Sequence, residues 1–342
     1  MIGLSFLRYG LRIMSGMNFE KFSDLLDRAH RFSGRSKAWL TRDMLHCAVR
    51  LGAGYYDYVT FGFWALTDAQ RETYVTRVVS KKLVTYLNDP AYENLFNDKA
   101  QFYTLFKDYI QRDWINFKTS SKQEVYAFIT RHPRVFSKPA HGSCGHDCEK
   151  LDSRDWPDFD AFYDALRTRN AWLLEETLPQ HPENEKFNSS SMNCLRLITL
   201  LDSDGAPHCI FATQKFGVNN RVVDNYGFGC RVDLKTGKIC SPGVSGDGSL
   251  GIVFSEHPNS HLPLIGHRVP HFFEAVEMVE RAALLVPRMR YIGWDVGITP
   301  DGPAIVEGNN YCAHDFWQLP AQTPEKTGML PVFQKYVPEF RR

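Results

Sequence analysis

Hydrophobic and polar residues follow two different periods along this chain, and the pattern changes near residue 88. Over residues 18–87 apolar positions recur three and four residues apart, as at Leu25 and Ala29, which is the spacing of helices with one buried face. Thr67 is a typical N-cap residue, and we expect it to begin an amphipathic helix that continues to Leu83. The first part of the chain is therefore predicted to be mainly helical.

Beyond residue 88, helical patterns alternate with short β-prone runs. The expected helices are 97–109, 121–129, 158–166 and 271–285, and the expected strands are 115–117, 134–139, 171–178, 193–200, 208–212, 291–298 and 304–307. Turn residues at 202–205 and 235–237 predict hairpins, whereas residues 241–266 are rich in loop-forming residues and show no clear period. No internal repeat or low-complexity linker divides the chain.

The most informative stretch is YIGWDVGITPDGPAIVEGNN, residues 291–310, in which TPDG separates two apolar runs. If residues 300–302 form a three-residue loop with a glycine bulge, counting back along both strands sets Asp295 opposite Glu307. Asn309 then points to the same face as Glu307. A two-residue loop would shift the register and separate the two carboxylates, so this prediction depends on the bulge.

Two carboxylates and an amide oxygen on one face of a hairpin are ligands that suit Mg²⁺. The alternative is a surface hairpin whose acidic residues are simply solvated. Ile292, Val296, Ile305 and Val306 make both strands apolar, which places the carboxylates among buried neighbours. Because buried charge without a partner is unfavourable, a bound cation would explain the pattern.

Two basic residues add candidate anion contacts. Lys138 ends the predicted strand 134–139 and precedes a glycine-bearing loop, residues 140–147, whose backbone N–H groups could approach phosphate oxygens. Neither GxxxxGK[ST] nor GxGxxG after a strand is present, and an ordinary turn is the alternative. Arg196 lies in an otherwise apolar strand and requires an anionic partner, either a structural carboxylate or a ligand phosphate.

Composition excludes some classes of function. The 342 residues are 43% hydrophobic and 23% charged with a net charge of +1, so no overall field favours nucleic acid or an anionic membrane. The eight cysteines form no disulfide framework, and we expect reduced thiols and a cytoplasmic location. Cys144, His146 and Cys148 lack the second ligand pair of a zinc site. The apolar start contains Arg8 and Arg12, so neither a signal peptide nor a transmembrane segment is expected.

Taken together, the motifs GWDVGIT and DGPAIVEGNN, with LLEETLPQHPE, NCLRLITL and VDNYGFG in order before them, resemble the ATP-grasp enzymes. The resemblance covers roughly residues 97–318 and is to the sugar-transfer-associated branch, which is related to α-L-glutamate ligases. It implies an α+β fold of two lobes with ATP between them, preceded by a helical N-terminal region. The implied domains are a helical region 1–95, a small lobe 96–177 that carries the phosphate loop, and a large lobe 178–342 that carries the magnesium hairpin.

The resemblance also implies ATP and Mg²⁺ as cofactors and assigns roles to residues. Those expected to bind the nucleotide, through two lysines, a glycine loop and an interlobe hinge, are Lys99, Lys138, Gly142, Ser143, Gly145, Glu175, Glu176, Thr177 and Leu178. Those expected to act on the transferred phosphate or the acceptor are Lys138, Arg196 and Asn225. The expected magnesium ligands are Asp295, Glu307 and Asn309.

The activity that follows is an ATP-dependent carboxylate–amine ligase, which forms an amide through an acyl phosphate and acts on a small molecule or a glycan precursor. Two alternatives stay open. A kinase that phosphorylates a sugar or polyol hydroxyl would need the same nucleotide site. A non-catalytic nucleotide-binding partner in polysaccharide assembly would not need a complete set of metal ligands.

Overall fold

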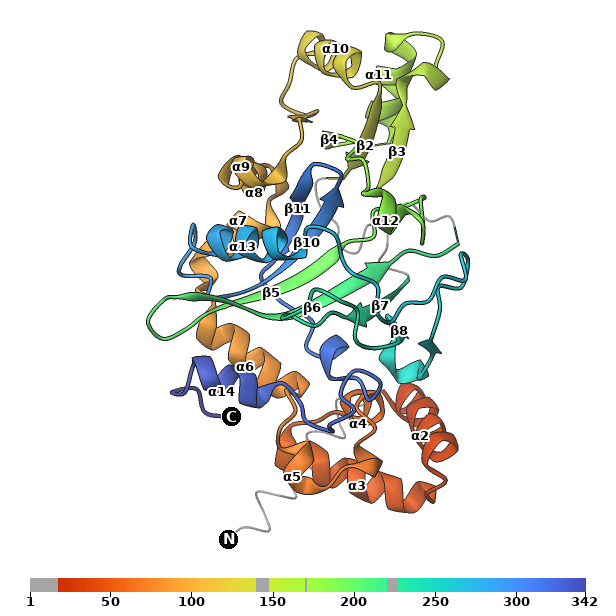
Figure 1. Cartoon of the computed structure of the whole chain (residues 1–342), viewed down its shortest axis with the longest axis vertical. Coiled ribbons are helices and arrows are strands. Elements are labelled where there is room, and N and C mark those ends of the chain that lie inside the picture. The colour runs from red at the N-terminus through yellow and green to blue at the C-terminus, as the bar shows by residue number, and fades with distance from the viewer. Residues whose placement is uncertain (1–17, 140–147, 170, 220–226) are drawn as a thin grey trace.

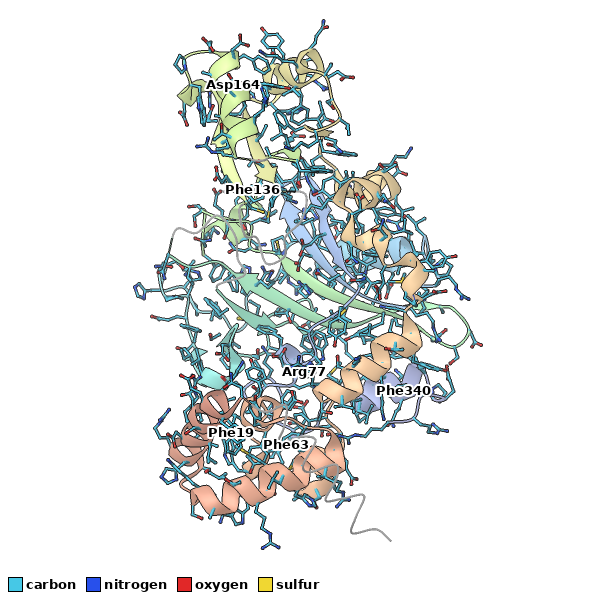
Figure 2. The ribbon with its side chains drawn as sticks, turned by 180° about the vertical axis from the view of Figure 1, so that it is seen from behind. Phe19, Phe63, Arg77, Phe136, Asp164 and Phe340 are labelled. Carbon is cyan, nitrogen blue, oxygen red and sulfur yellow. The ribbon has the colours of Figure 1, made fainter. Side chains whose placement is uncertain are left out.

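A computed structural model of the chain describes residues 18–139, 148–169, 171–219 and 227–342. Three regions follow one another along the long axis of the molecule (Figure 1). The N-terminal helices lie at one end, a large sheet occupies the middle, and a small sheet with two helices lies at the other end. In Figure 2, Phe63 marks the helical end and Asp164 marks the opposite end.

The helical region begins as its local sequence predicts. Its helices are α2 (Phe19–Ser33), α3 (Lys37–Leu51), α4 (Tyr55–Thr60), η1 (Phe63–Ala65), α5 (Asp68–Arg71) and α6 (Arg77–Leu87). Thr67 caps α5 in a capping box with Gln70, as its residue type predicts. The prediction of a single helix from Thr67 to Leu83 is wrong, because the helix ends after α5 and a second helix, α6, begins at Arg77. The Asp57 carboxylate accepts a hydrogen bond from the backbone N–H of Arg77 (2.9 Å), so a distant side chain marks the new start.

The small sheet has the strand order β1–β4–β2–β3 within the described residues, and all of its pairs are antiparallel. Its strands are β1 (Trp114–Asn116), β2 (Arg134–Lys138), β3 (Glu149–Asp152) and β4 (Leu173–Glu176). The helices α10 (Lys122–Arg131) and α11 (Phe159–Thr168) bury Val125, Phe128 and Phe162 in a core shared with this sheet. Ser121 caps α10 in a second capping box, as expected.

The segment that joins α6 to the small sheet departs from prediction. A continuous helix was expected over residues 97–109, but the chain forms η2 (Pro90–Tyr92), α7 (Asn94–Asn97), α8 (Lys99–Leu105) and α9 (Lys107–Ile110). The Asp98 carboxylate caps α8 by accepting from the N–H groups of Ala100 (2.9 Å) and Gln101 (3.1 Å), which ends α7 and starts a new helix.

The large sheet has the order β11–β10–β5–β6–β7–β8–β9 within the described residues, again with antiparallel pairs. Its strands are β5 (Leu195–Leu201), β6 (Pro207–Phe216), β7 (Phe228–Arg231), β8 (Gly243–Ser245), β9 (Val253–Phe254), β10 (Tyr291–Thr299) and β11 (Gly302–Asn309). The strands β8 and β9 come from the stretch that showed no period in the sequence. The remaining short helices are η3 (Ser153–Asp155), α12 (Pro182–Glu185), η4 (Gly248–Leu250) and η5 (Phe316–Gln318).

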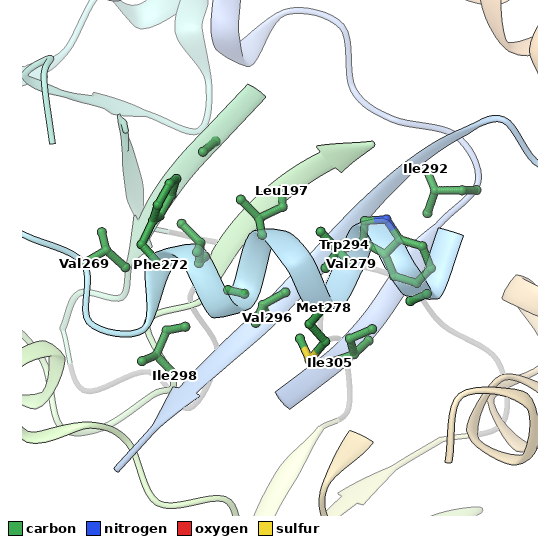
Figure 3. Close-up of a cluster of buried hydrophobic side chains, with 14 of the residues drawn as sticks. Leu197, Val269, Phe272, Met278, Val279, Ile292, Trp294, Val296, Ile298 and Ile305 are labelled. Atoms are coloured by element: carbon green, nitrogen blue, oxygen red, sulfur yellow. The ribbon is translucent and has the colours of Figure 1, made fainter. Parts of the chain in front are cut away.

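One face of the large sheet is mainly apolar and is covered by α13 (Phe272–Ala283). Val279 and Met278 of this helix pack with Leu197, Trp294 and Val296 from the strands (Figure 3). This is the main core of the molecule, and its strand positions alternate with those of the other face, as expected for period-two strands.

The opposite face of the sheet is divided along its strands. Ile198, Leu200 and Tyr291 at one end are buried under α6 and α14 (Leu330–Tyr336). Arg196 and Asp295, on the same face at the other end, are charged. Figure 1 shows α6 and α14 on the side of the large sheet that faces away from the small sheet. The apolar half thus anchors the sheet, and the polar half stays outside that core.

The hairpin of β10 and β11 confirms the register but not the predicted reason for it. Thr299 pairs with Gly302, so the loop has two residues and not three. Asp295 nevertheless pairs with Glu307, because Val306 is an extra residue that forms a bulge in β11. The bulge compensates for the shorter loop, and the two carboxylates end up opposite each other.

This mixture of helices and antiparallel sheets confirms the α+β class. The domain boundaries at residues 95 and 177 stay a prediction. In the parts of the chain that the structure describes, no helix combines the length and the apolar composition needed to cross a bilayer.

Asn88, directly after α6, joins this helix to the hairpin of β10 and β11 through three hydrogen bonds. Its Nδ2 donates to the carbonyl oxygens of Tyr291 (2.9 Å) and Asn310 (2.8 Å), and its Oδ1 accepts from the N–H of Tyr291 (2.9 Å). We expect Asn88→Ala to lower the free energy of unfolding by about 1–3 kcal/mol, because buried backbone groups lose their partners. Urea unfolding measures the change, with exposed Asn94→Ala as the control. Equal stability of the two variants would contradict the prediction.

Candidate active site

A row of polar side chains crosses the large sheet on its divided face. Glu307, Asp295, Arg196, Thr213 and Arg231 lie directly opposite one another on the successive strands β11, β10, β5, β6 and β7. Directly opposed residues of antiparallel strands share a face and lie close together. Five separate stretches of sequence therefore contribute to one line of functional groups.

The strongest contact in this row joins Arg196 to Asp295. Arg196 Nε donates to Asp295 Oδ1 (2.6 Å) and Nη2 donates to Oδ2 (2.8 Å), while Lys215 Nζ lies 3.8 Å from Oδ2. Burial by itself raises the pKa of Asp295, but the charges of Arg196 and Lys215 outweigh it and hold that pKa below its ordinary value. Of the two partners that the sequence left open for Arg196, the structure supplies the carboxylate.

Glu307 is in the opposite electrostatic situation. Burial and then the adjacent charge of Asp295 raise its pKa above the ordinary value, although its side chain keeps solvent-exposed surface. Asn309 lies beside it, with Nδ2 3.4 Å from Glu307 Oε1. Two carboxylates in contact require either a shared proton or a cation between them.

The donor set fits Mg²⁺. Asp295, Glu307 and Asn309 bring two carboxylates and one amide together, as predicted, and hard oxygen donors with room for water and phosphate are what this ion prefers. Within the described residues no group of three or more His, Cys, Asp or Glu side chains forms a metal site. The binding of a metal by Asp295, Glu307 and Asn309 stays a prediction.

Lys138 belongs to a second, fully buried polar cluster. Its Nζ lies 2.6 Å from Glu175 Oε1 and donates to the Tyr103 hydroxyl (2.8 Å), and Arg112 Nε donates to Glu175 Oε2 (2.7 Å). Burial alone lowers the pKa of Lys138, but the Glu175 charge more than reverses this and keeps the ammonium charged. Sequence reasoning missed Tyr103 and Arg112, because nothing near them in the chain indicates partners as distant as β4.

The predicted hinge is only partly available for adenine. The Glu175 side chain is used in the buried cluster, and the backbone N–H of Glu176 donates to the carbonyl of Asp113 (2.9 Å). Thr177 and Leu178 follow directly after β4, where the chain passes between the two sheets. Adenine binding by these residues stays a prediction.

Cys148 lies within electrostatic range of charged residues from both sheets. Burial raises the pKa of its thiol, Lys138 and Lys99 act to lower it, and Glu175 and Glu307 act to raise it. Four charged groups from four different elements thus act on one side chain. The sequence suggested Cys148 only as a poor zinc ligand, and its position at this site was not predicted.

Several predicted residues lie outside the described part of the chain. They are Gly142, Ser143 and Gly145 of the glycine loop, Asn225 of the acceptor segment, and Cys144 and His146 of the zinc alternative.

An α+β architecture of two antiparallel sheets, with Asp295 and Glu307 paired on the large sheet and a buried lysine on the small sheet, is the arrangement of an ATP-grasp protein. The chain belongs to the sugar-transfer associated ATP-grasp family, whose model matches residues 160–335, just over half of its length. The resemblance stated from the motifs is therefore confirmed. No curated protein sequence matches the chain.

Similar solved structures include three ligases or synthetases. The ATP-grasp ligase PsnB, solved with a minimal precursor, Mg and ADP, is 16% identical over 72% of this chain and 61% of its own, with a TM-score of 0.39. D-cycloserine synthetase DcsG is 11% identical over 78% and 77%, with a TM-score of 0.40. N5-carboxyaminoimidazole ribonucleotide synthetase from Thermotoga maritima is 10% identical over 68% and 48%, with a TM-score of 0.40. The chain spans about six tenths of the length of PsnB, and similarity this low does not specify a substrate.

Glu175 provides a pH-dependent test of the buried cluster. Burial raises its pKa, but Arg112 and Lys138 outweigh burial and hold it below the ordinary value of 4.5. Glu175→Gln should lower the free energy of unfolding at pH 7 by about 3–5 kcal/mol, because two buried cations lose their counter-ion. Since the folded-state pKa is depressed, this contribution is present above pH 4.5 and is lost as the pH falls further.

The measurement is urea unfolding of the wild type and the variant from about pH 7 to pH 3.5. The matched control is Glu176→Gln, the neighbouring and more exposed carboxylate, which should change stability little. A difference between wild type and Glu175→Gln that stays constant below pH 4.5 would contradict the assigned cause.

Proposed function

We propose that this protein is an ATP- and Mg²⁺-dependent carboxylate–amine ligase that forms an amide through an acyl phosphate. The observation that carries the proposal is the contact between Asp295 and Glu307, in line with Arg196 and close to the charge of Lys138. Two adjacent carboxylates repel each other and would not stabilise a purely structural hairpin. A site that binds a metal–nucleotide complex requires such a pair.

The reaction has two steps. An oxygen of the substrate carboxylate attacks the γ-phosphorus of ATP, the bond to the bridging oxygen breaks, and ADP leaves with that electron pair. The amine nitrogen then attacks the acyl carbon, the carbon–oxygen bond breaks, and inorganic phosphate leaves while the amine loses a proton. Neither step requires a covalent bond to the protein, so catalysis consists of positioning and charge stabilisation.

The residues of the chain divide this task. Mg²⁺, held by Asp295, Glu307 and Asn309, would supply charge neutralisation at the phosphate oxygens. Arg196 keeps Asp295 ionised and oriented through its two hydrogen bonds. Lys138 presents a permanent positive charge to the nucleotide from the small sheet, and Lys99 adds a second one from the start of α8.

The acceptor is proposed from the family description alone. An association with sugar transfer favours a glycan precursor or another small molecule that carries the carboxylate or the amine.

A thermal-shift titration with ATP and Mg²⁺ tests the nucleotide site. Ligand at about 100 times its Kd stabilises the native state by about 2.7 kcal/mol, so wild type should show a clear rise in Tm. Glu307→Gln should show a much smaller rise, because one anionic metal ligand is lost. Glu277→Gln, an exposed carboxylate on α13, is the control and should behave like wild type.

Phosphate release then identifies the reaction. A ligase releases phosphate only when carboxylate and amine are both present, and Glu307→Gln should reduce the rate by roughly 10²–10³. A kinase would form ADP and a phosphoester without free phosphate. If no nucleotide shifts the Tm of the wild type, the proposed function is wrong.

A further inference from the structure

The geometry of the metal hairpin depends on the bulge at Val306. Side chains alternate between the two faces of a strand, so a regular strand from Ile305 onward would turn Glu307 and Asn309 to the opposite face from Asp295. The extra residue reverses that alternation between Ile305 and Glu307. Whatever holds the bulge therefore decides on which face the metal ligands lie.

Arg112 contacts the bulge directly. Its Nη1 donates to the carbonyl oxygen of Ile305 (2.8 Å), and its Nη2 donates to that of Val306 (3.3 Å). A bulge leaves backbone groups without the usual ladder partner, and an unpaired buried carbonyl is unfavourable. The guanidinium gives both carbonyls a charged donor.

The remaining donors of Arg112 fix the guanidinium itself. Nε donates to Glu175 Oε2 (2.7 Å), Nη1 also donates to the carbonyl of Ile110 (2.9 Å), and Nη2 also donates to the Tyr103 hydroxyl (2.5 Å). All five N–H donors of the side chain are thus used. With only 2% of the side chain exposed, water does not compete for them.

These contacts connect the two sheets. Glu175 lies on β4 of the small sheet and is shared between Arg112 and Lys138, whereas Ile305 and Val306 lie on β11 of the large sheet. One ion pair, Glu175 with Arg112, therefore holds both parts of the proposed site. Its carboxylate holds Lys138, and its guanidinium holds the strand that carries Glu307 and Asn309.

We propose that Arg112 is a positioning residue that holds the Val306 bulge and so keeps Glu307 and Asn309 on the same face as Asp295. The inference rests on the proposed function, since it concerns the metal site of that reaction. Arg112 touches neither metal nor substrate and acts through the backbone of β11. Its role is one of geometry, because a planar fork with five donors satisfies two adjacent carbonyls and a carboxylate together, and an ammonium group does not.

The test compares Arg112→Lys with wild type in the full-length protein, using Mn²⁺ as a spectroscopic probe for the divalent site in the presence of ADP. Lysine keeps the positive charge beside Glu175 and loses the fork. We expect the affinity for Mn²⁺, measured from the electron paramagnetic resonance signal of the free ion, to fall by about 10–100-fold, the usual effect of removing a residue that orients a metal ligand. Hydrogen exchange in peptides that cover residues 302–309 should accelerate at the same time.

The matched control is Arg71→Lys in the helical region. Arg71 is also buried and bonds both a carboxylate, Asp43 (2.7 Å), and a backbone carbonyl, that of Phe63 (2.9 Å). Its replacement should lower stability without changing Mn²⁺ affinity. If Arg112→Lys does not fold, Tyr103→Phe removes one anchor of the guanidinium and should weaken Mn²⁺ binding by a smaller factor.

The outcomes separate the two proposals. Wild type that binds Mn²⁺ and ADP, together with an Arg112→Lys variant of unchanged affinity, overturns the role of Arg112 and leaves the proposed function intact. An equal loss in Arg71→Lys also overturns it, because the effect would then be global. Wild type that binds neither Mn²⁺ nor ADP rejects the proposed function, and the inference with it.

Discussion

Asp295 and Glu307 lie opposite each other only because β11 contains one extra residue, which forms a β-bulge. Strands alternate their side chains strictly, so the two-residue loop of this hairpin alone would place Glu307 on the face that α13 covers. The extra residue Val306 restores the alignment, but the carbonyl groups at the bulge then need hydrogen-bond donors inside the protein. Arg112, which lies outside the sheet, donates to these carbonyls. The bulge and the buried guanidinium therefore depend on each other.

The same face of the sheet serves both stability and chemistry because its two halves differ. Ile198 and Leu200 lie under α6 and α14, while Arg196, two residues earlier on β5, meets Asp295. Gly293 makes this close approach possible, since a Cβ there would lie 3.0 Å from Cys312 Sγ and 3.3 Å from Arg196 Nη1. The packed apolar half of this face thus holds Arg196 and Asp295 in fixed positions, which a mobile loop would not do.

Burial strengthens the electrostatic interactions between the charged groups of the site. Asp295 is held ionised by Arg196 and Lys215, Glu175 is held ionised by Lys138 and Arg112, and Glu307 has a raised pKa beside Asp295. The ionised forms of Asp295 and Glu175 are stabilised by the cations in contact with them, whereas at Glu307 burial and the Asp295 charge outweigh the nearby cations. This contrast between the acids is the physical reason why the proposed cation would bind beside Glu307 and not at Glu175.

Much of the fold and part of the site follow from the sequence itself. Capping residues such as Thr67 and Ser121, the period of the strands, the partner required by Arg196 and the donor set of the hairpin are local patterns that act over a few residues. The break between α5 and α6, the Val306 bulge and the cluster of Tyr103, Arg112, Lys138 and Glu175 were decided by tertiary structure. Each depends on contacts between residues far apart in the chain, such as Asp57 with the start of α6 or Arg112 with β11, and burial rather than neighbouring sequence sets their strength.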